Sequence, residues 1–207
     1  IYMYNILVTG GNGQLGSELR EIAPNYKDYN FLFTDVKDLD ITNHTAVAAF
    51  VESNDITVII NCAAYTAVDK AEAQEDVASA INHLAVANFA QIAKDKNIRL
   101  IHISTDYVFD GTNHKPYVET DTPNPQSVYG KTKLEGELAM QQINPANTII
   151  IRTSWVYSKF GNNFVKTMLR LAETRDEISV VTDQIGTPTN AADLAEAILN
   201  ILPQVSN

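Results

Sequence analysis

The sequence predicts an α/β fold, a doubly wound parallel sheet with helices on both of its faces. Short runs rich in β-branched residues alternate with longer helical patterns along the whole chain. This order is typical of parallel strands joined by right-handed crossovers. Most of the short runs are apolar throughout rather than alternating, as expected for strands that helices cover on both sides. A glycine-rich turn follows the first run, where such folds bind their ligands.

The predicted elements alternate in chain order. The expected strands lie at residues 5–9, 30–34, 57–61, 99–104, 148–153 and 178–181. The expected helices lie at residues 14–22, 46–52, 71–96 (in one or two pieces), 129–143, 164–175 and 191–202. The proline-containing stretch 108–127 interrupts this order and predicts an ordered loop or a lid over a site. Ligands of such sheets bind at the carboxyl ends of the strands, so chemistry is expected directly after each strand.

The composition excludes several classes of protein. Of the 207 residues, 45% are hydrophobic and 19% are charged, which is typical of a globular chain, and no apolar run reaches the ~20 residues of a membrane span. Lys and Arg number 15 against 25 Asp and Glu, and this net charge of −10 argues against a nucleic-acid partner. The one cysteine, Cys62, is interpreted as a core residue and not a nucleophile, and its use favours a cytoplasmic location.

Glycines spaced as GxxGxxG separate the first expected strand from the first expected helix. Small residues let the chain turn sharply and let a pyrophosphate approach the backbone, while the helix N-terminus offers N–H donors. An ordinary glycine-rich turn is the alternative, but the position in a βαβ unit favours a Rossmann-type dinucleotide site. The expected cofactor contacts in this turn are Gly10, Asn12, Gly13, Gln14, Leu15 and Gly16.

Further cofactor contacts are expected after the second and third strands. Asp35 lies where a carboxylate accepts hydrogen bonds from an adenosine ribose, and it favours NADH because it repels a 2′-phosphate; alternatively, it merely ends a strand. Asp40 and Ile41 are expected to flank the adenine. Small alanines after the third strand permit close approach of a cofactor to the backbone. Tight packing of a helix on the sheet is the alternative reason for small residues there. The expected contacts in this segment are Ala63, Ala64 and Tyr65.

Tyr129 and Lys133 form a Tyr-x-x-x-Lys pattern, which places both side chains on one face of a helix. A nearby ammonium brings the pKa of a phenol closer to the working range of an acid–base catalyst. The spacing alone arises readily by chance, so its position after the fourth strand carries the prediction. Thr105, at the end of that strand, is a candidate hydrogen-bond donor to a substrate oxygen, with a local cap as the alternative.

Together, these features resemble the extended short-chain dehydrogenase/reductase superfamily. Five longer strings are similar to the dTDP-4-dehydrorhamnose reductase family: AVDKAE at 67–72, STDYVF at 104–109, RTSWVY at 152–157, GNNF at 161–164 and DQIGTPT at 183–189. The resemblance extends from about residue 3 to residue 202. These strings are more specific to one family than the glycine spacing is.

The resemblance implies reduction of the 4-keto group of dTDP-4-dehydro-L-rhamnose, a cytoplasmic step of polysaccharide biosynthesis, with NADPH or NADH as the cofactor. By position, Tyr129 donates a proton to the alkoxide that forms at C4. Lys133 holds the nicotinamide ribose and lowers the pKa of Tyr129, while Thr105 hydrogen-bonds the reacting oxygen. The substrate contacts that the resemblance implies are Thr105, Asp106, Val108, Phe109 and Trp155.

The chain also departs from the family pattern. Some members form homodimers around Mg²⁺ held by acidic side chains, and Glu18 lies at one such ligand position. Asn190-Ala191-Ala192 offers no second acid after Thr189, so no metal site is predicted, and Mg²⁺ and a homodimer stay open. Members of the family continue further along the chain. Residues 1–207 are therefore expected to form the NAD(P)-binding domain, with a C-terminal substrate domain largely absent and turnover slow or nil.

Two other functions remain as alternatives. One is an epimerase or dehydratase of the same superfamily, which retains NAD tightly instead of exchanging it. The other is a regulatory subunit like the β-subunit of methionine adenosyltransferase, which also resembles this family. The presence of both Tyr129 and Lys133 favours an enzyme over a regulatory subunit.

Overall fold

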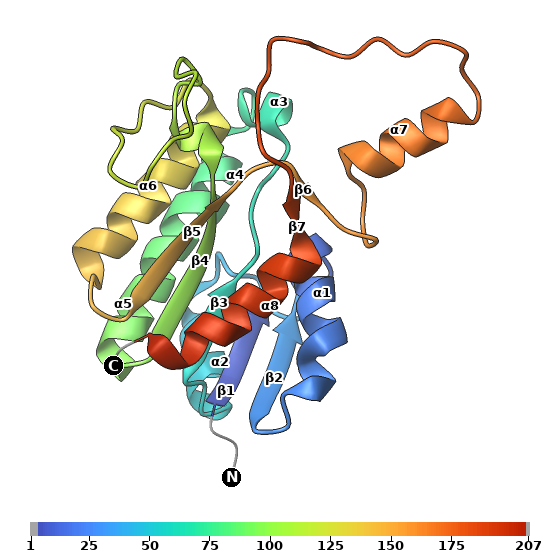
Figure 1. Ribbon diagram of the computed structural model, residues 1–207. Helices are drawn as coiled ribbons and strands as arrows, with labels where there is room; N and C mark the ends of the chain where they lie inside the picture. Colours follow the sequence, from blue (N-terminus) through green and yellow to red (C-terminus); the bar gives the residue numbers. More distant parts are fainter. Residues whose placement is uncertain (1–3, 206–207) are drawn as a thin grey trace.

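The computed structural model describes residues 4–205 and contains a five-stranded parallel sheet (Figure 1). Its strands are paired in the order β2-β1-β3-β4-β5. Their bounds are Tyr4–Thr9 for β1, Tyr29–Thr34 for β2, Val58–Asn61 for β3, Arg99–Thr105 for β4 and Thr148–Thr153 for β5. The strand order reverses between β1 and β3, where ligands of doubly wound sheets bind.

Helices cover both faces of this sheet, which confirms the predicted fold class. One face is covered by α1 (Gln14–Ile22) and α8 (Ala191–Ile201). The opposite face is covered by α2 (His44–Ser53), α5 (Ala85–Lys96) and α6 (Val128–Ile143). The remaining α-helices are α3 (Val68–Ala71), α4 (Glu75–Ser79) and α7 (Phe164–Ala172). Short 3₁₀ turns lie at Ala23–Asn25, Asp106–Val108 and Leu202–Gln204.

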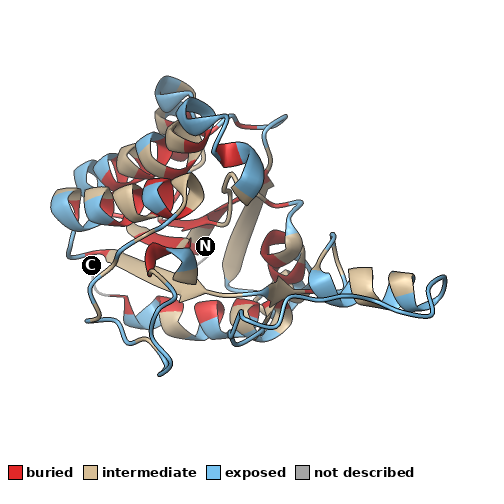
Figure 2. Ribbon diagram, turned by 90° about the horizontal axis from the view of Figure 1, so that it is seen from above, coloured by how far each residue is buried: buried red, intermediate tan, exposed pale blue. Residues whose placement is uncertain are grey.

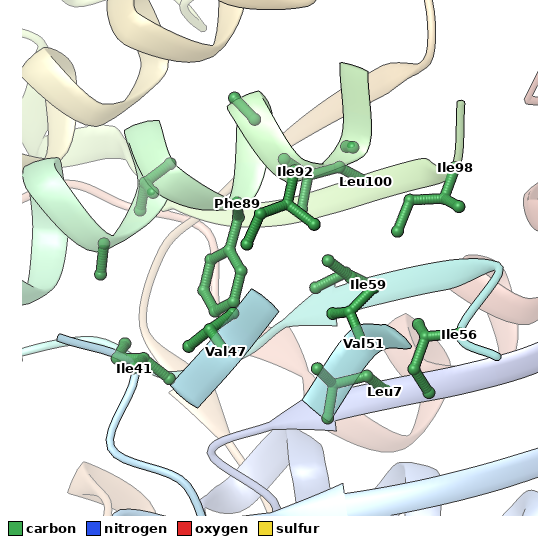
Figure 3. Close-up of a cluster of buried hydrophobic side chains, with 14 of the residues drawn as sticks. Leu7, Ile41, Val47, Val51, Ile56, Ile59, Phe89, Ile92, Ile98 and Leu100 are labelled. Carbon is green, nitrogen blue, oxygen red and sulfur yellow. The ribbon is translucent and has the colours of Figure 1, made fainter. Parts of the chain in front are cut away.

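Alternate residues of each central strand enter two separate apolar cores, because successive side chains of a strand point to opposite faces. Ile6 and Val8 pack under α1 and α8, while Leu7 packs on the other side. Figure 3 shows that second core, where Phe89 of α5 points toward Val47 of α2. Phe89 is fully buried, and burying a side chain of this kind stabilises the fold by roughly 1.5–3 kcal/mol.

Polar side chains fix where several helices begin. Ser127 precedes α6, and its hydroxyl accepts a hydrogen bond from Gly130 N–H at 3.1 Å. This cap satisfies a donor that the first turn of a helix leaves unpaired. It also places Tyr129 in the first turn of α6, at the carboxyl end of β4. Asn43, Asn163 and Asn190 cap α2, α7 and α8 in the same way.

The expected strand at 178–181 is wrong. None of its residues is in a strand, and Val180 and Val181 are exposed. A β-branched run indicates only that a segment suits a pleated, half-buried surface; it does not supply a neighbouring strand. Two short strands that the sequence reading missed, β6 (Val156–Tyr157) and β7 (Thr189–Asn190), pair with each other instead.

The helix α7 stands apart from the rest of the fold. It ends at Ala172, earlier than the expected 175, and it contains no buried residue. Figures 1 and 2 show that α7 and the exposed segment after it extend away from the sheet.

The expected helix at 71–96 is divided by a π-helical segment, Ala80–Leu84, between α4 and α5. Asn82 in this segment is buried, and its side chain bonds both backbone groups of Tyr65, at 2.9 Å to N and 3.1 Å to O. It also donates to the Thr132 hydroxyl on α6 at 3.2 Å. The π-helical segment therefore connects the loop after β3 to the helix that carries Tyr129.

Candidate active site

A cavity of about 580 Å³ opens at the carboxyl ends of the strands, where the strand order reverses. Its lining comes from the glycine turn, from the loops after β2 and β3, from the end of β4 and from α6. Eleven of the residues predicted to form the site lie in this lining: Gly10, Gly13, Gln14, Leu15, Asp35, Asp40, Ile41, Ala63, Ala64, Tyr129 and Lys133. The structure therefore brings the dinucleotide turn and the Tyr–Lys pair to one cavity.

The glycine turn is tight because two backbone segments meet there. Gly10 has φ of +65°, and a Cβ at this position would lie 2.8 Å from the nitrogen of Ala63. A Cβ on Gly16 would lie 2.4 Å from the carbonyl oxygen of Gly10. The helix α1 begins after Gly13 with no side-chain cap, so the N–H groups of its first turn are free for an anionic ligand. These features fit a pyrophosphate against the turn.

Asp35 connects the end of β2 to the glycine turn. Its Oδ2 accepts a hydrogen bond from Asn12 N–H at 3.1 Å, and its Oδ1 accepts one from Val36 N–H at 2.8 Å. Asp40 is occupied locally, because its Oδ1 accepts from the N–H and the hydroxyl of Thr42 at 2.9 and 2.7 Å. The hydrogen bond from the Thr42 hydroxyl is the main reason that the pKa of Asp40 is lowered.

Three residues predicted as cofactor contacts do not line the cavity. Asn12 is exposed, and Gly16 is buried beneath the turn. Tyr65 donates its hydroxyl to Gln74 at 2.6 Å and is held through its backbone by Asn82. Cofactor contact by these three residues stays a prediction.

Tyr129 lines the cavity beside Thr105. Its ring packs edge-on against Tyr107 with centroids 5.5 Å apart. The Thr105 hydroxyl donates to Oδ1 of Asp106 at 3.2 Å and accepts from Tyr107 N–H at 3.1 Å. Burial raises the pKa of Tyr129; the Thr105 hydroxyl lowers it, and the charges of Asp106 and Tyr107 raise it further. Lys133 is not among the groups that shift this pKa, so the expected lowering by Lys133 is wrong. A phenol with a raised pKa keeps its proton at neutral pH, which suits a proton donor.

Lys133 is almost completely buried, one helical turn after Tyr129. Its Nζ donates to the carbonyl oxygen of Ile103 at 2.6 Å and lies 3.3 Å from Nε2 of His102. Burial lowers the pKa of Lys133 to about 8, although the neighbouring Glu137 and Cys62 act to raise it. The Cys62 thiol has its own pKa raised to about 12 by burial, in agreement with its interpretation as an unreactive residue.

A set of buried polar residues beside Lys133 was missed in the sequence: Thr9, Asn61 and His102. Thr9 donates to Asn61 at 2.7 Å, and Asn61 lies 3.0 Å from His102. Thr9 and Asn61 end the apolar strands β1 and β3, whereas His102 lies in the middle of β4. A polar residue that ends such a strand was the available signal for Thr9 and Asn61.

The residues predicted to hold the sugar nucleotide do not line the cavity. Asp106 has its pKa raised by burial, and Val108 is fully buried. Phe109 stacks on Tyr117 with centroids 4.2 Å apart. Trp155 is 45% exposed, with φ of +45°, an unusual conformation for a residue other than glycine. Their contact with the substrate stays a prediction.

A largely buried ion pair joins β5 to α6. Arg152 donates twice to Glu137, from Nε to Oε1 at 3.0 Å and from Nη2 to Oε2 at 2.6 Å. The guanidinium of Arg152 also lies over the ring of Phe109, 5.0 Å from its centroid. Breaking such a pair would leave an unpaired charge in the interior, so the position of Arg152 is fixed relative to α6. Through its contact with Arg152, the ring of Phe109 is fixed relative to α6 as well.

Neither a metal cluster nor a membrane-spanning helix is found within residues 4–205. No three His, Cys, Asp or Glu side chains of this part come close enough together to hold a metal ion. Glu18, considered above as a magnesium ligand, accepts a hydrogen bond from the Ser158 hydroxyl at 2.6 Å. Across the same residues, every helix is too short or too polar to cross a bilayer.

Residues 4–207 match the family model described as "RmlD substrate binding domain". A dTDP-4-dehydrorhamnose reductase of Aggregatibacter actinomycetemcomitans is 45% identical over 203 residues, which cover 98% of this chain and 69% of that protein. Similar relatives from Sinorhizobium fredii and Escherichia coli are covered to 65% and 64% of their length. The chain thus spans about two thirds of the length of its curated relatives.

A solved structure with a similar fold is a dTDP-4-dehydrorhamnose reductase from Bacillus anthracis in complex with NADP. It has a TM-score of 0.93 and 43% identity, with 98% of this chain and 71% of that chain covered.

Proposed function

Because the chain belongs to the family described as RmlD substrate binding domain, we propose that it reduces the 4-keto group of dTDP-4-dehydro-L-rhamnose to give dTDP-L-rhamnose, with NADPH or NADH as the cofactor. One observation carries the proposal. The cavity joins a glycine turn that fits a pyrophosphate to a Tyr–Lys pair on α6. The enzyme is thus an oxidoreductase of dTDP-rhamnose biosynthesis.

The residues around the reacting carbonyl have different roles in the proposed reaction. The reduced nicotinamide supplies the hydride when it is bound. Tyr129 holds the proton that the substrate oxygen receives, and its raised pKa keeps that proton in place until the alkoxide forms. Thr105, at the end of β4, donates to the same oxygen as negative charge develops there. Lys133, one helical turn after Tyr129 on the same face of α6, holds the nicotinamide ribose.

The remaining predicted site residues bind either the cofactor or the substrate. The glycine turn, Asp35 and the residues after β3 hold the cofactor, and Asp106, Val108, Phe109 and Trp155 hold the dTDP-sugar. We place the enzyme in the cytoplasm, with no nucleic-acid or membrane partner. Size measurement tests for a homodimer, and chelation tests for a requirement for Mg²⁺, for which no site is predicted.

Asp35→Ala is expected to raise the affinity for NADPH relative to NADH by roughly tenfold, because it removes a negative charge near the 2′-phosphate. The ratio of the two dissociation constants measures the effect. Asp28→Ala makes the same charge change in the exposed residue just before β2, and it should leave the ratio unchanged. An unaltered ratio in Asp35→Ala contradicts the assigned role.

The test of the proposed function is the oxidation of NADPH and NADH in the presence of dTDP-4-dehydro-L-rhamnose. A GDP-linked keto sugar is assayed in parallel. Single-turnover conditions are used, so that one round of hydride transfer is sufficient for detection. We expect formation of dTDP-L-rhamnose with the dTDP-sugar alone, and reduction of the GDP-linked sugar instead contradicts the proposal.

The alternatives predict different results in the same experiment. An epimerase or dehydratase would be purified with NAD still bound and would not consume reduced cofactor. A regulatory subunit would neither bind the cofactor productively nor form any product.

A further inference from the structure

Thr9, Asn61 and His102 form a continuous row across three strands. They lie directly opposite one another on β1, β3 and β4, and each is fully buried. Two residues earlier in each strand, the same face of the sheet carries only apolar side chains: Leu7, Ile59 and Leu100. The polar row therefore faces α5 and α6, and it ends at Lys133.

The hydrogen bonds along this row run in one direction. The Thr9 hydroxyl donates to Oδ1 of Asn61 at 2.7 Å, which leaves Nδ2 of Asn61 facing Nδ1 of His102 at 3.0 Å. An amide nitrogen only donates, so Nδ1 accepts, and the neutral ring carries its proton on Nε2. Nε2 of His102 lies 3.3 Å from Nζ of Lys133, so its N–H points at that nitrogen.

The ring of His102 is neutral, because burial and the neighbouring Lys133 hold its pKa well below the ordinary value. An ammonium has no lone pair with which to accept the Nε2–H, whereas a neutral amine has one. Nζ keeps its own donation to the carbonyl oxygen of Ile103 in both states. The other titratable groups that influence Lys133 are Glu137 on α6 and Cys62 after β3.

We infer that His102 is a positioning residue for Lys133: its Nε2–H donates to the Nζ lone pair, which fixes the side chain and favours the neutral amine. Asn61 and Thr9 set the direction of this donation. The inference rests on the proposed function for the catalytic use of Lys133, but the protonation of Lys133 can be measured without turnover. The row makes Lys133 a group that exchanges its proton near neutral pH.

The experiment follows the ¹³Cε chemical shift of Lys133 with pH in the full chain labelled with ¹³C-lysine. Lys133→Arg assigns the signal by removing it. The midpoint in the unmodified chain is expected at about 8. In His102→Phe, which keeps a ring and removes both nitrogens, it should rise by roughly half to one pH unit, the effect of one neutral hydrogen bond.

Two further variants make the result decisive. Thr9→Val keeps the shape of the side chain and removes the first donor of the row, so the midpoint should rise by a smaller amount. This variant decides the question if His102→Phe does not fold. His83→Phe, a control at a partly exposed histidine that pairs with Glu135, should not move the midpoint.

An unchanged midpoint in the folded variants would mean that His102 only fills space, which overturns the inference. A lower midpoint would mean that the ring accepts from the ammonium, which also overturns it. In the reductase assay, activity that needs the ammonium falls as the pH rises through the pKa of Lys133, and His102→Phe should move this decline upward by the same amount. A chain that titrates as expected but reduces the GDP-linked sugar instead of the dTDP-sugar contradicts the proposed function alone.

Discussion

Tyr129→Phe is expected to lower the single-turnover rate of keto-sugar reduction by roughly 10²–10⁴-fold, because it removes the proton that the substrate oxygen receives. The cofactor dissociation constant should change by less than about twofold, since a phenyl ring still packs against Tyr107. Because the pKa of Tyr129 is raised, the unmodified chain should keep this proton throughout the neutral range.

Tyr107→Phe is the matched control for this prediction. It removes the hydroxyl of the neighbouring ring, which is 41% exposed, and the rate should stay within about threefold of the unmodified chain. Full activity of Tyr129→Phe would exclude Tyr129 as the proton donor. An equal loss in both variants would indicate damage to the packing of the two rings and not to proton transfer.

Gly16→Ala is expected to destabilise the fold by about 1–3 kcal/mol and to weaken cofactor binding at least tenfold, because the turn must open to admit the methyl group. The added Cβ would lie 2.4 Å from the carbonyl oxygen of Gly10 and 2.7 Å from Cα of Gly11. Both contacts are with backbone, which cannot rotate away as a side chain can. Chemical denaturation and titration with NADPH measure the two effects.

Gly13→Ala is the comparison within the same turn. Its Cβ would approach only the carbonyl oxygen of Gly10, at 3.3 Å, and the φ of −73° suits any residue. The free energy of unfolding should therefore fall by less than about 1 kcal/mol. If Gly16→Ala and Gly13→Ala are equally stable, then the close approach of α1 to the turn does not require a glycine at position 16.

The sequence predicted the central sheet well, because every buried strand is a compact apolar run between a turn and a helix. It failed at 178–181, where the residues suit a strand but pair with none. It also missed β6 and β7, which are two residues long and carry no periodic pattern. Pairing between segments distant in the sequence is not encoded in the local pattern of either.

The site was predictable where a residue acts by its position after a strand. Gly10, Asp35, Tyr129 and Lys133 all line the cavity. The electrostatic balance was not predictable, because the spacing of Tyr129 and Lys133 does not report how much water burial removes from each. The role of His102 could not be read either, since it depends on the register of neighbouring strands.

The π-helical segment Ala80–Leu84 limits which changes in length the chain can tolerate. Each of its hydrogen bonds spans five residues instead of the four of an α-helix, so the helices on either side follow different rotational phases. Deleting one residue here would restore a regular helix and rotate one half by about 100° relative to the other. Phe89 would then leave the core, or Asn82 would leave the Tyr65 loop. Substitutions on the surface of this helix are tolerable, whereas a single-codon deletion within it separates the core from the active-site loop.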